Sequence, residues 1–196
     1  MAEISLDLVK KLRDKTGIGM MDCKKALEEA NGDIEKAIEL LRKKGAAVAE
    51  KRSGNATAEG IVHAYIHPGS RVGVMIEINC ETDFVARTPD MTKFANDLCM
   101  QIAAFRPVCI SSTEVDPNVV AKEKEIYREQ LKDKPAAALD KIIEGKIQKF
   151  YTEVCLLNQP FIKDEKLTVD DVLKGLIAKV GENIKINRFV RFEIGK

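Results

Sequence analysis

Residues 60–79 read GIVHAYIHPGSRVGVMIEIN, and this stretch decides the fold class. Apolar and polar residues alternate on both sides of Pro68-Gly69-Ser70, as they do in two half-buried strands joined by a turn. We therefore expect a β-hairpin here. Near the C-terminus, residues 184–194 (IKINRFVRFEI) alternate in the same way and predict a third strand. The chain should accordingly contain a three-stranded antiparallel sheet.

Three short helices are expected before this hairpin. The first ends at the turn Thr16–Gly19, and the second runs from about Asp22 to Asn31-Gly32. Asp33 is a good N-cap for the third, which we expect to end near Gly45. Three helices of this length form a minimal bundle that is marginally stable alone.

The composition after the third helix indicates a domain boundary. Residues 47–58 are mostly small and polar and only weakly periodic, which is typical of a partly helical linker. We therefore divide the chain into a three-helix N-terminal domain (1–46), a linker (47–58) and a core domain (59–196).

The core domain should also contain several helices. Apolar residues recur at helical spacing from about 88 to 104 and from about 166 to 180. Two charged segments, about 117–131 and 135–154, each open with proline at a first-turn position and predict an antiparallel helical hairpin. In that hairpin Val120, Ile126, Tyr127 and Leu131 should face the apolar stripe of the second helix. The predicted fold class is α+β.

Composition excludes several classes of protein. The 196 residues include 32 Lys+Arg and 31 Asp+Glu, so the net charge of +1 argues against a dedicated polyanion binder. No apolar run of ~18 residues and no signal-peptide core is present, so we expect a cytoplasmic protein without a membrane partner. The five cysteines are odd in number and lack CxxC spacing, which favours reduced thiols. With only His63 and His67 available, and no spacing that suggests a ligand set, a metal site is not expected. No cofactor is expected either.

Signals for an enzyme are weak. The chain has no GxxxxGK[ST], GxSxG or HExxH motif. Glu81 and Asp83 are close enough in sequence for acid–base chemistry, and Cys80 beside them could act as a nucleophile with an unusually acidic thiol. Solvated loop carboxylates are the alternative. The basic stretch Arg42-Lys43-Lys44 lacks interleaved aromatic residues, which favours a solvated helix face over an RNA-binding patch.

Residues 79–87, NCETDFVAR, leave a strand and precede a helix, so they should form a short connecting loop. Loops on a rigid scaffold are frequent sites of recognition. Two interpretations of Phe84 stay open. Its ring either fills the core under the loop or is an exposed aromatic anchor for a partner's pocket.

Two segments resemble signatures of one family. Residues 12–27, LRDKTGIGMMDCKKAL, are similar to the N-terminal signature of bacterial elongation factor Ts, and residues 79–86, NCETDFVA, resemble its second signature. Residues 144–161 and 188–193 are similar to later segments of the family. The resemblance covers essentially the whole chain and is to the short forms that have a single core unit.

The resemblance implies a function and a partner. Elongation factor Ts is the guanine-nucleotide exchange factor of elongation factor Tu, a GTPase of translation elongation, and it is not an enzyme in the chemical sense. By resemblance, one group of residues would disturb the Mg²⁺ and phosphate site of the GDP-bound GTPase and release GDP: Thr82, Asp83, Phe84 and Val85. A second group would contact its nucleotide-binding domain: Arg13, Met20 and Met21.

Two further expectations concern partners. A sheet of three strands leaves two open edges, and the chain has one core unit, so we expect a homodimer formed through the core sheet. The three-helix domain resembles ubiquitin-associated folds, so a generic adaptor is the competing class. In an adaptor, the loop at Thr82–Val85 would be dispensable.

Overall fold

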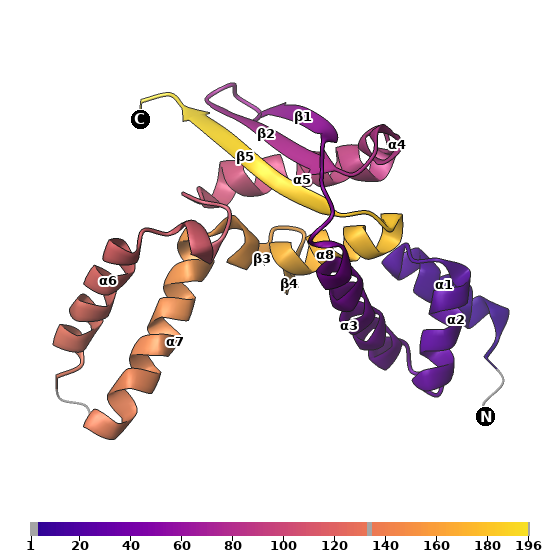
Figure 1. Cartoon of the computed structure of the whole chain (residues 1–196), viewed down its shortest axis with the longest axis horizontal. Helices are drawn as coiled ribbons and strands as arrows, with labels where there is room; N and C mark the ends of the chain where they lie inside the picture. Colours follow the sequence, from indigo (N-terminus) through magenta and orange to yellow (C-terminus); the bar gives the residue numbers. More distant parts are fainter. Residues whose placement is uncertain (1–3, 133–134, 196) are drawn as a thin grey trace. The chain divides into compact units, whose positions relative to one another are not determined.

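A computed structural model describes residues 4–132 and 135–195, so Asp133 and Lys134, between the arms of the expected hairpin, lie outside the described residues. Its helices are α1 Leu6–Thr16, α2 Met20–Glu29, α3 Ile34–Arg52, α4 Asp83–Ala86, α5 Pro89–Phe105, α6 Pro117–Gln130, α7 Ala136–Val154 and α8 Val169–Val180, with 3₁₀ turns η1 Ser112–Glu114 and η2 Leu156–Asn158 (Figure 1). Its strands are β1 Glu59–Ile66, β2 Val72–Cys80, β3 Pro160–Phe161, β4 Asp164–Thr168 and β5 Ile184–Glu193. The fold is α+β, as predicted.

The chain divides into two units, which are described separately. Unit 1 comprises Met1–Val62, Glu77–Lys93 and Asp171–Asn187, and unit 2 comprises His63–Ile76, Phe94–Asp170 and Arg188–Lys196. The boundaries of the domains proposed from the sequence stay a prediction.

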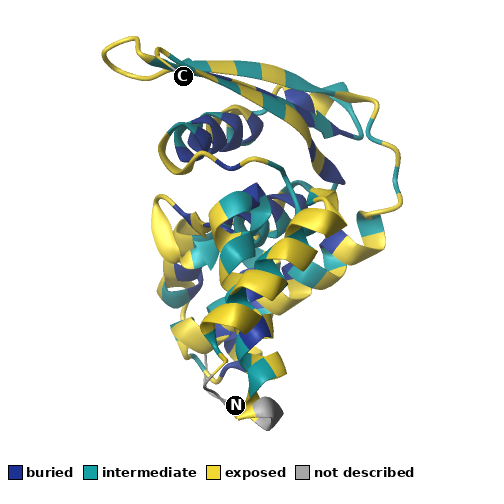
Figure 2. Cartoon of the chain, turned by 90° about the vertical axis from the view of Figure 1, so that its left-hand side faces the viewer, coloured by how far each residue is buried: buried dark blue, intermediate teal, exposed yellow. Residues whose placement is uncertain are grey.

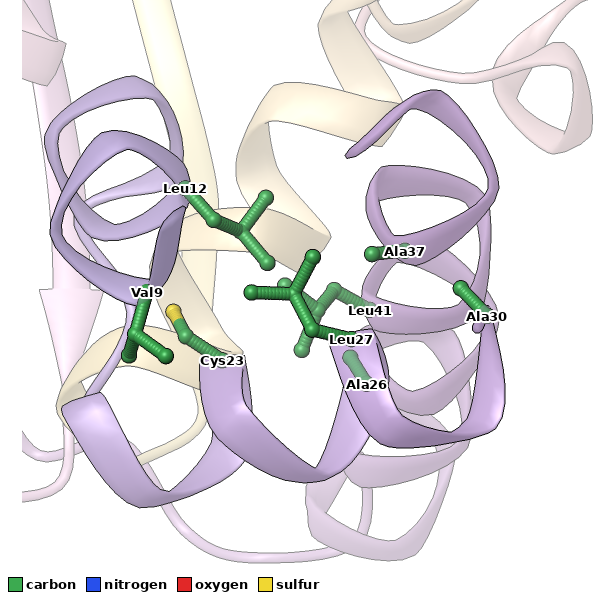
Figure 3. Close-up of a cluster of buried hydrophobic side chains, with 8 residues drawn as sticks. All are labelled: Val9, Leu12, Cys23, Ala26, Leu27, Ala30, Ala37 and Leu41. Carbon is green, nitrogen blue, oxygen red and sulfur yellow. The ribbon is translucent and has the colours of Figure 1, made fainter. Parts of the chain in front are cut away.

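In unit 1, α1, α2 and α3 enclose an apolar core. Figure 3 shows its side chains converging from the three helices, and the buried set is Val9, Leu12, Cys23, Ala26, Leu27, Ala30, Ala37 and Leu41. Each helix has its local stop or start signal. Gly17 ends α1 in the left-handed region (φ 68°), which glycine adopts without strain, and Asp33 caps α3 by accepting from the Glu35 and Lys36 amides.

The expected end of the third helix near Gly45 is wrong, because α3 continues to Arg52. Gly45 is buried inside the helix, and a Cβ there would lie 3.3 Å from the Ala178 Cβ of α8. The glycine therefore permits two helices to approach closely and does not stop one. The helical part of the expected linker is the last turns of α3.

The main sheet has the strand order β1-β2-β5. Alternate residues of β2 are buried, namely Val74, Ile76, Ile78 and Cys80, which is the period of two that the sequence predicted. In unit 2, α5 packs under this sheet (Figure 2). The Arg191 guanidinium of β5 donates to the Ala103 carbonyl at 3.1 Å, and the Cys99 thiol lies 4.0 Å from the His63 carbonyl of β1.

Unit 2 also contains the predicted helical hairpin, α6 with α7. The Lys146 ammonium of α7 lies 5.0 Å from the centre of the Tyr127 ring of α6, so Tyr127 faces α7 as expected. Ile143 and Ile147 of α7 are buried. Ile126 is 47% exposed, and the prediction that it faces the apolar stripe of α7, like the same prediction for Val120 and Leu131, stays a prediction.

Unit 2 also has a second, two-stranded sheet, β3 with β4, which was not among the elements expected from the sequence. Residues 166–168 belong to β4, so α8 begins at Val169 and not at Lys166 as predicted. The buried amide of Gln101 on α5 holds this sheet: it donates to the Gln159 side chain (3.1 Å) and accepts from the Ile162 amide (2.8 Å). Satisfied polar groups of this kind fix one docking geometry.

Candidate functional site

The segment that follows β2 forms one helical turn, α4, in place of an extended loop. The Thr82 hydroxyl is the N-cap and accepts from the Val85 amide at 3.5 Å. Val85 and Ala86 are buried, while Phe84 between Asp83 and Val85 is 82% exposed. We call residues 82–85 the Phe84 turn. The interpretation that Phe84 fills the core is wrong, and its ring has the exposure that an aromatic anchor requires.

One glutamate from a distant part of unit 1 holds the start of the Phe84 turn. The Thr82 hydroxyl donates to Glu182 Oε1 at 2.7 Å, and the Thr82 amide donates to Glu182 Oε2 at 3.0 Å. The Cys80 thiol donates to the Thr82 carbonyl at 3.1 Å. The hydroxyl, the amide and the carbonyl of Thr82 therefore all have hydrogen-bond partners.

Glu81, the preceding residue, joins three segments of unit 1. Its carboxylate accepts from the Asn183 amide at 2.6 Å and from the Asn55 side chain at 3.0 Å. The Arg52 guanidinium, at the end of α3, lies 3.4 Å away. The Asn183 amide, then the Asn55 amide group, then Arg52 lower the pKa of Glu81 below its ordinary value, against the opposing effect of burial. This carboxylate is ionised and structural.

The geometry does not support the acid–base or thiol interpretations. Asp83 pairs with Arg87 (3.0 Å), whereas Glu81 bonds Asn183 and Asn55, so the two carboxylates have separate partners. Burial, and next the charge of Glu182, raise the pKa of the Cys80 thiol. A thiol nucleophile needs a lowered pKa, so the alternative of Cys80 as a nucleophile is not supported.

The predicted contact residues of the three-helix part lie on α1 and α2. Arg13 is exposed on α1, and Met21 at the start of α2 is 67% exposed. Met20 is half-buried and packs against the apolar core of the bundle. Arg13 and Met21 can therefore meet a partner directly, while Met20 contributes chiefly to the core.

Lys179 of α8 connects the two motif-bearing segments of unit 1. Its side chain lies against the turn between α1 and α2, where a Cβ on Gly17 would come 3.2 Å from Nζ. The same Nζ pairs with Asp90 Oδ1 at 2.7 Å, at the start of α5. Thus the Thr16–Gly19 turn and the region just after the Phe84 turn share one lysine.

Other candidate sites are accounted for by structural contacts. The basic stretch on α3 is engaged in ion pairs, Lys44 with Asp22 (2.6 Å) and Arg42 with Asp171 (3.7 Å). In residues 4–132 and 135–195, no three His, Cys, Asp or Glu side chains come together as a metal site would need. None of the described helices has the length and apolar character to cross a membrane.

Comparison with known proteins decides the family. The family model for elongation factor Ts matches residues 8–196. The chain is 56% identical over 194 residues to elongation factor Ts of Thermotoga maritima, with 99% of this chain and 98% of that protein covered. The chain belongs to the elongation factor Ts family. Its members from Carboxydothermus hydrogenoformans (56% identical; 98% of this chain and 90% of that protein covered) and Fervidobacterium nodosum (55%; 99% and 100%) are also matched almost end to end.

Membership of the elongation factor Ts family makes the chain a translation elongation factor.

Three residues that hold the motif segments in place were not found from the sequence: Glu182, Asn183 and Lys179. Glu182 and Asn183 lie about a hundred positions from the residues that they contact, between the predicted α8 helix and the final strand. Their place just after the end of a predicted helix is the one local feature that they share, and it does not indicate which segment they contact.

Proposed function

We propose that the chain is the guanine-nucleotide exchange factor of elongation factor Tu in translation elongation. It binds the GDP-bound GTPase, disturbs its Mg²⁺ and phosphate site, and releases GDP without a chemical step of its own. The observation that carries the proposal is the exposure of Phe84, 82%, on a turn that is bonded to Glu182 at its start and to Thr88 at its end. An exposed, preorganised aromatic residue is the usual form of an interface hot spot.

The mechanism needs only differential binding. A P-loop GTPase holds GDP through backbone amides, a lysine and Mg²⁺, which demands near-octahedral geometry at ~2.0–2.1 Å. The Phe84 ring, inserted beside that site, displaces the ion's surroundings. Thr82 and Val85 set the shape of the turn, and Asp83 fixes the partner's backbone beside it. If the factor weakens GDP binding ~1,000-fold, GDP weakens the factor's binding equally, a coupling of about 4 kcal/mol.

The three-helix part supplies a second contact with the nucleotide-binding domain of the GTPase. The exposed Arg13 offers charged hydrogen bonds, and the exposed Met21 offers a flexible apolar contact. Met20, half-buried in the core, supports the start of α2 from which Met21 projects. The proposed place of action is the cytoplasm, with no cofactor, no membrane and no direct nucleic-acid contact.

Stopped-flow release of fluorescent GDP from elongation factor Tu tests the proposal. The wild-type chain should accelerate GDP release strongly. At saturating factor, the release rate with Phe84→Ala should be at least tenfold lower than the rate with the wild-type chain. Phe105→Ala, which truncates an exposed ring at the end of α5, is the matched control and should release GDP at the wild-type rate. An unchanged rate in Phe84→Ala would refute the role of the ring, and a generic adaptor would show no acceleration at all.

A second copy of the chain is the proposed partner of the outer sheet face in unit 2. That face exposes apolar side chains of all three strands, Ile66, Met75, Val190 and Phe192. A shallow hollow lined by Ile66, Arg71 and Phe192 lies among them. A contiguous exposed apolar face of this kind favours self-association through an isologous contact.

Sedimentation tests the homodimer. The wild-type chain should sediment as a dimer at tens of micromolar, and Phe192→Asp should convert it to a folded monomer, because the residue is 68% exposed in the single chain. Its unfolding temperature should fall only by the part that association contributes. Val108→Asp, at another exposed apolar residue of unit 2, is the control and should stay dimeric. A monomeric wild-type chain at that concentration would overturn the proposal.

A further inference from the structure

The position of the Phe84 ring depends on the backbone that carries it. Since the ring is 82% exposed, its own chain offers few contacts that could hold it. At the C-terminal side of the turn, the Val85 side chain is buried, and the Val85 carbonyl accepts from the Thr88 hydroxyl at 2.8 Å. These contacts fix where the turn ends but leave its start to other groups.

Glu182 holds the start. Its two carboxylate oxygens take both donors of Thr82, the hydroxyl and the amide, at 2.7 and 3.0 Å. Because the hydroxyl proton points to Glu182, a lone pair of the same oxygen is left to accept from the Val85 amide and cap the turn. Removing Glu182 would leave the Thr82 hydroxyl free to rotate and its amide without this acceptor.

The segment that carries Glu182 is itself held in place by hydrogen bonds. The Asn183 amide donates to Glu81 at 2.6 Å, so residues 81–82 and 182–183 bond reciprocally through two carboxylates. Asn183 is 2% exposed, and its side chain donates to the Asn55 carbonyl at 2.9 Å. Glu182 therefore lies next to a residue, Asn183, that is itself hydrogen-bonded to Glu81 and Asn55.

We infer that Glu182 is a positioning residue for nucleotide exchange, an inference that rests on the proposed function. It acts through Thr82: by holding the start of the Phe84 turn in the free protein, it presents the ring in the orientation that the partner's pocket receives. Binding then does not have to order the turn, and more of the interaction energy is available to open the nucleotide site.

The first test needs no partner. The chain contains no tryptophan, so Phe84→Trp places a single fluorescent reporter on the turn. Time-resolved anisotropy should show a larger amplitude of nanosecond motion in E182A/F84W than in F84W, with E182Q/F84W between them. E165A/F84W, which removes the same charge from an exposed site on β4, is the matched control and should equal F84W. Equal anisotropy decays in E182A/F84W and F84W would overturn the inference.

The second test is a double-mutant cycle in GDP release. At saturating factor, E182A should be about tenfold slower than the wild-type chain, and E182A/F84A should be no slower than F84A, because one residue acts through the other. E182Q keeps one acceptor oxygen, so its GDP release rate should lie between those of E182A and the wild-type chain. If Glu182 only stabilised the whole fold, E182A would also lower the release rate in the F84A background. If the two single losses of release rate multiplied in E182A/F84A, the residues would act independently and the inference would be overturned.

The outcomes separate the two proposals. If the wild-type chain does not accelerate GDP release, the proposed function fails, and the anisotropy of the partner-free chain still decides whether Glu182 orders the turn. If F84A slows release and E182A does not, the proposed function stands and Glu182 is no positioning residue. Thermal unfolding checks that each variant is folded, and E182Q, which keeps the size of the side chain and one acceptor oxygen, carries both tests if E182A unfolds.

Discussion

The Phe84 turn and the α6–α7 hairpin are stabilised in opposite ways. The turn is short, and its anchors, Glu182 and Asn183, come from about a hundred residues away. The hairpin is long, its two helices are neighbours in sequence, and no residue of α6, which is described throughout, is buried. The turn therefore takes its order from the rest of unit 1, while the hairpin depends on a few apolar residues of α7. Each prediction below tests one side of this contrast.

The largest effect is expected in the hairpin region. Ile147→Ala removes one of the few buried side chains of α7, which is 2% exposed, and should lower the free energy of unfolding by about 2–5 kcal/mol. Val119→Ala, at a 42% exposed residue of α6, is the control and should cost less than ~1 kcal/mol. Urea unfolding measures both, and similar costs for the two would show that the hairpin is not held by α7.

A smaller, pH-dependent effect is expected beside the turn. Because the pKa of Glu81 is lowered in the folded chain, chiefly by the Asn183 amide and then by Asn55, its ionised form adds stability above the ordinary glutamate pKa of about 4.3. That stability is lost as the pH falls through the lowered value. Unfolding measured from neutral to acidic pH should show a steeper acid loss for the wild-type chain than for Glu81→Gln. Parallel profiles would show that Glu81 does not hold these segments together.

The next effect should be a gain. Gly145 lies exposed in the middle of α7, and a Cβ there would meet no atom within 4 Å. Gly145→Ala should therefore raise the free energy of unfolding by about 0.5–1 kcal/mol through helix propensity. The matched control is Gly45→Ala in α3, where the Cβ would lie 3.3 Å from Ala178 and the gain should disappear. Urea unfolding decides, and equal gains would contradict the close packing at Gly45.

The smallest effect concerns the ion pair between the two hairpin helices. Arg128 and Asp140 are 3.8 Å apart and largely exposed. Arg128→Ala should change the free energy of unfolding by less than about 0.5 kcal/mol, and salt should not enlarge the difference. A cost above ~1 kcal/mol would mean that local charges, and not the buried side chains of α7, hold the hairpin.

Regular periodicity carried most of the fold prediction. The alternation in residues 60–79 and 184–194 predicted strands, and the helical spacing from about 88 to 104 predicted a helix, all of which the structure confirms. Prediction failed where one residue type serves two purposes. Gly45 has the local pattern of a helix stop, yet it permits helix packing against Ala178. β3 has two residues, too few to show any alternation.

The candidate site was predictable in part. The motif at residues 79–86 located the turn, but a phenylalanine in a loop can equally be buried or exposed, and only the fold decides in favour of exposure for Phe84. The partner of Thr82 could not be predicted, because a carboxylate at position 182 has the same local pattern as any solvated glutamate after a helix. Contacts between distant segments depend on packing that local sequence does not encode.

The exposure of Phe84 separates the demands of folding from those of recognition. A side chain that contributes so little to its own protein can be exchanged with hardly any penalty in solubility, expression or heat resistance. Any selective pressure on position 84 must therefore come from outside the chain, and a defect there would be invisible in the isolated molecule and show itself only when a binding partner is present.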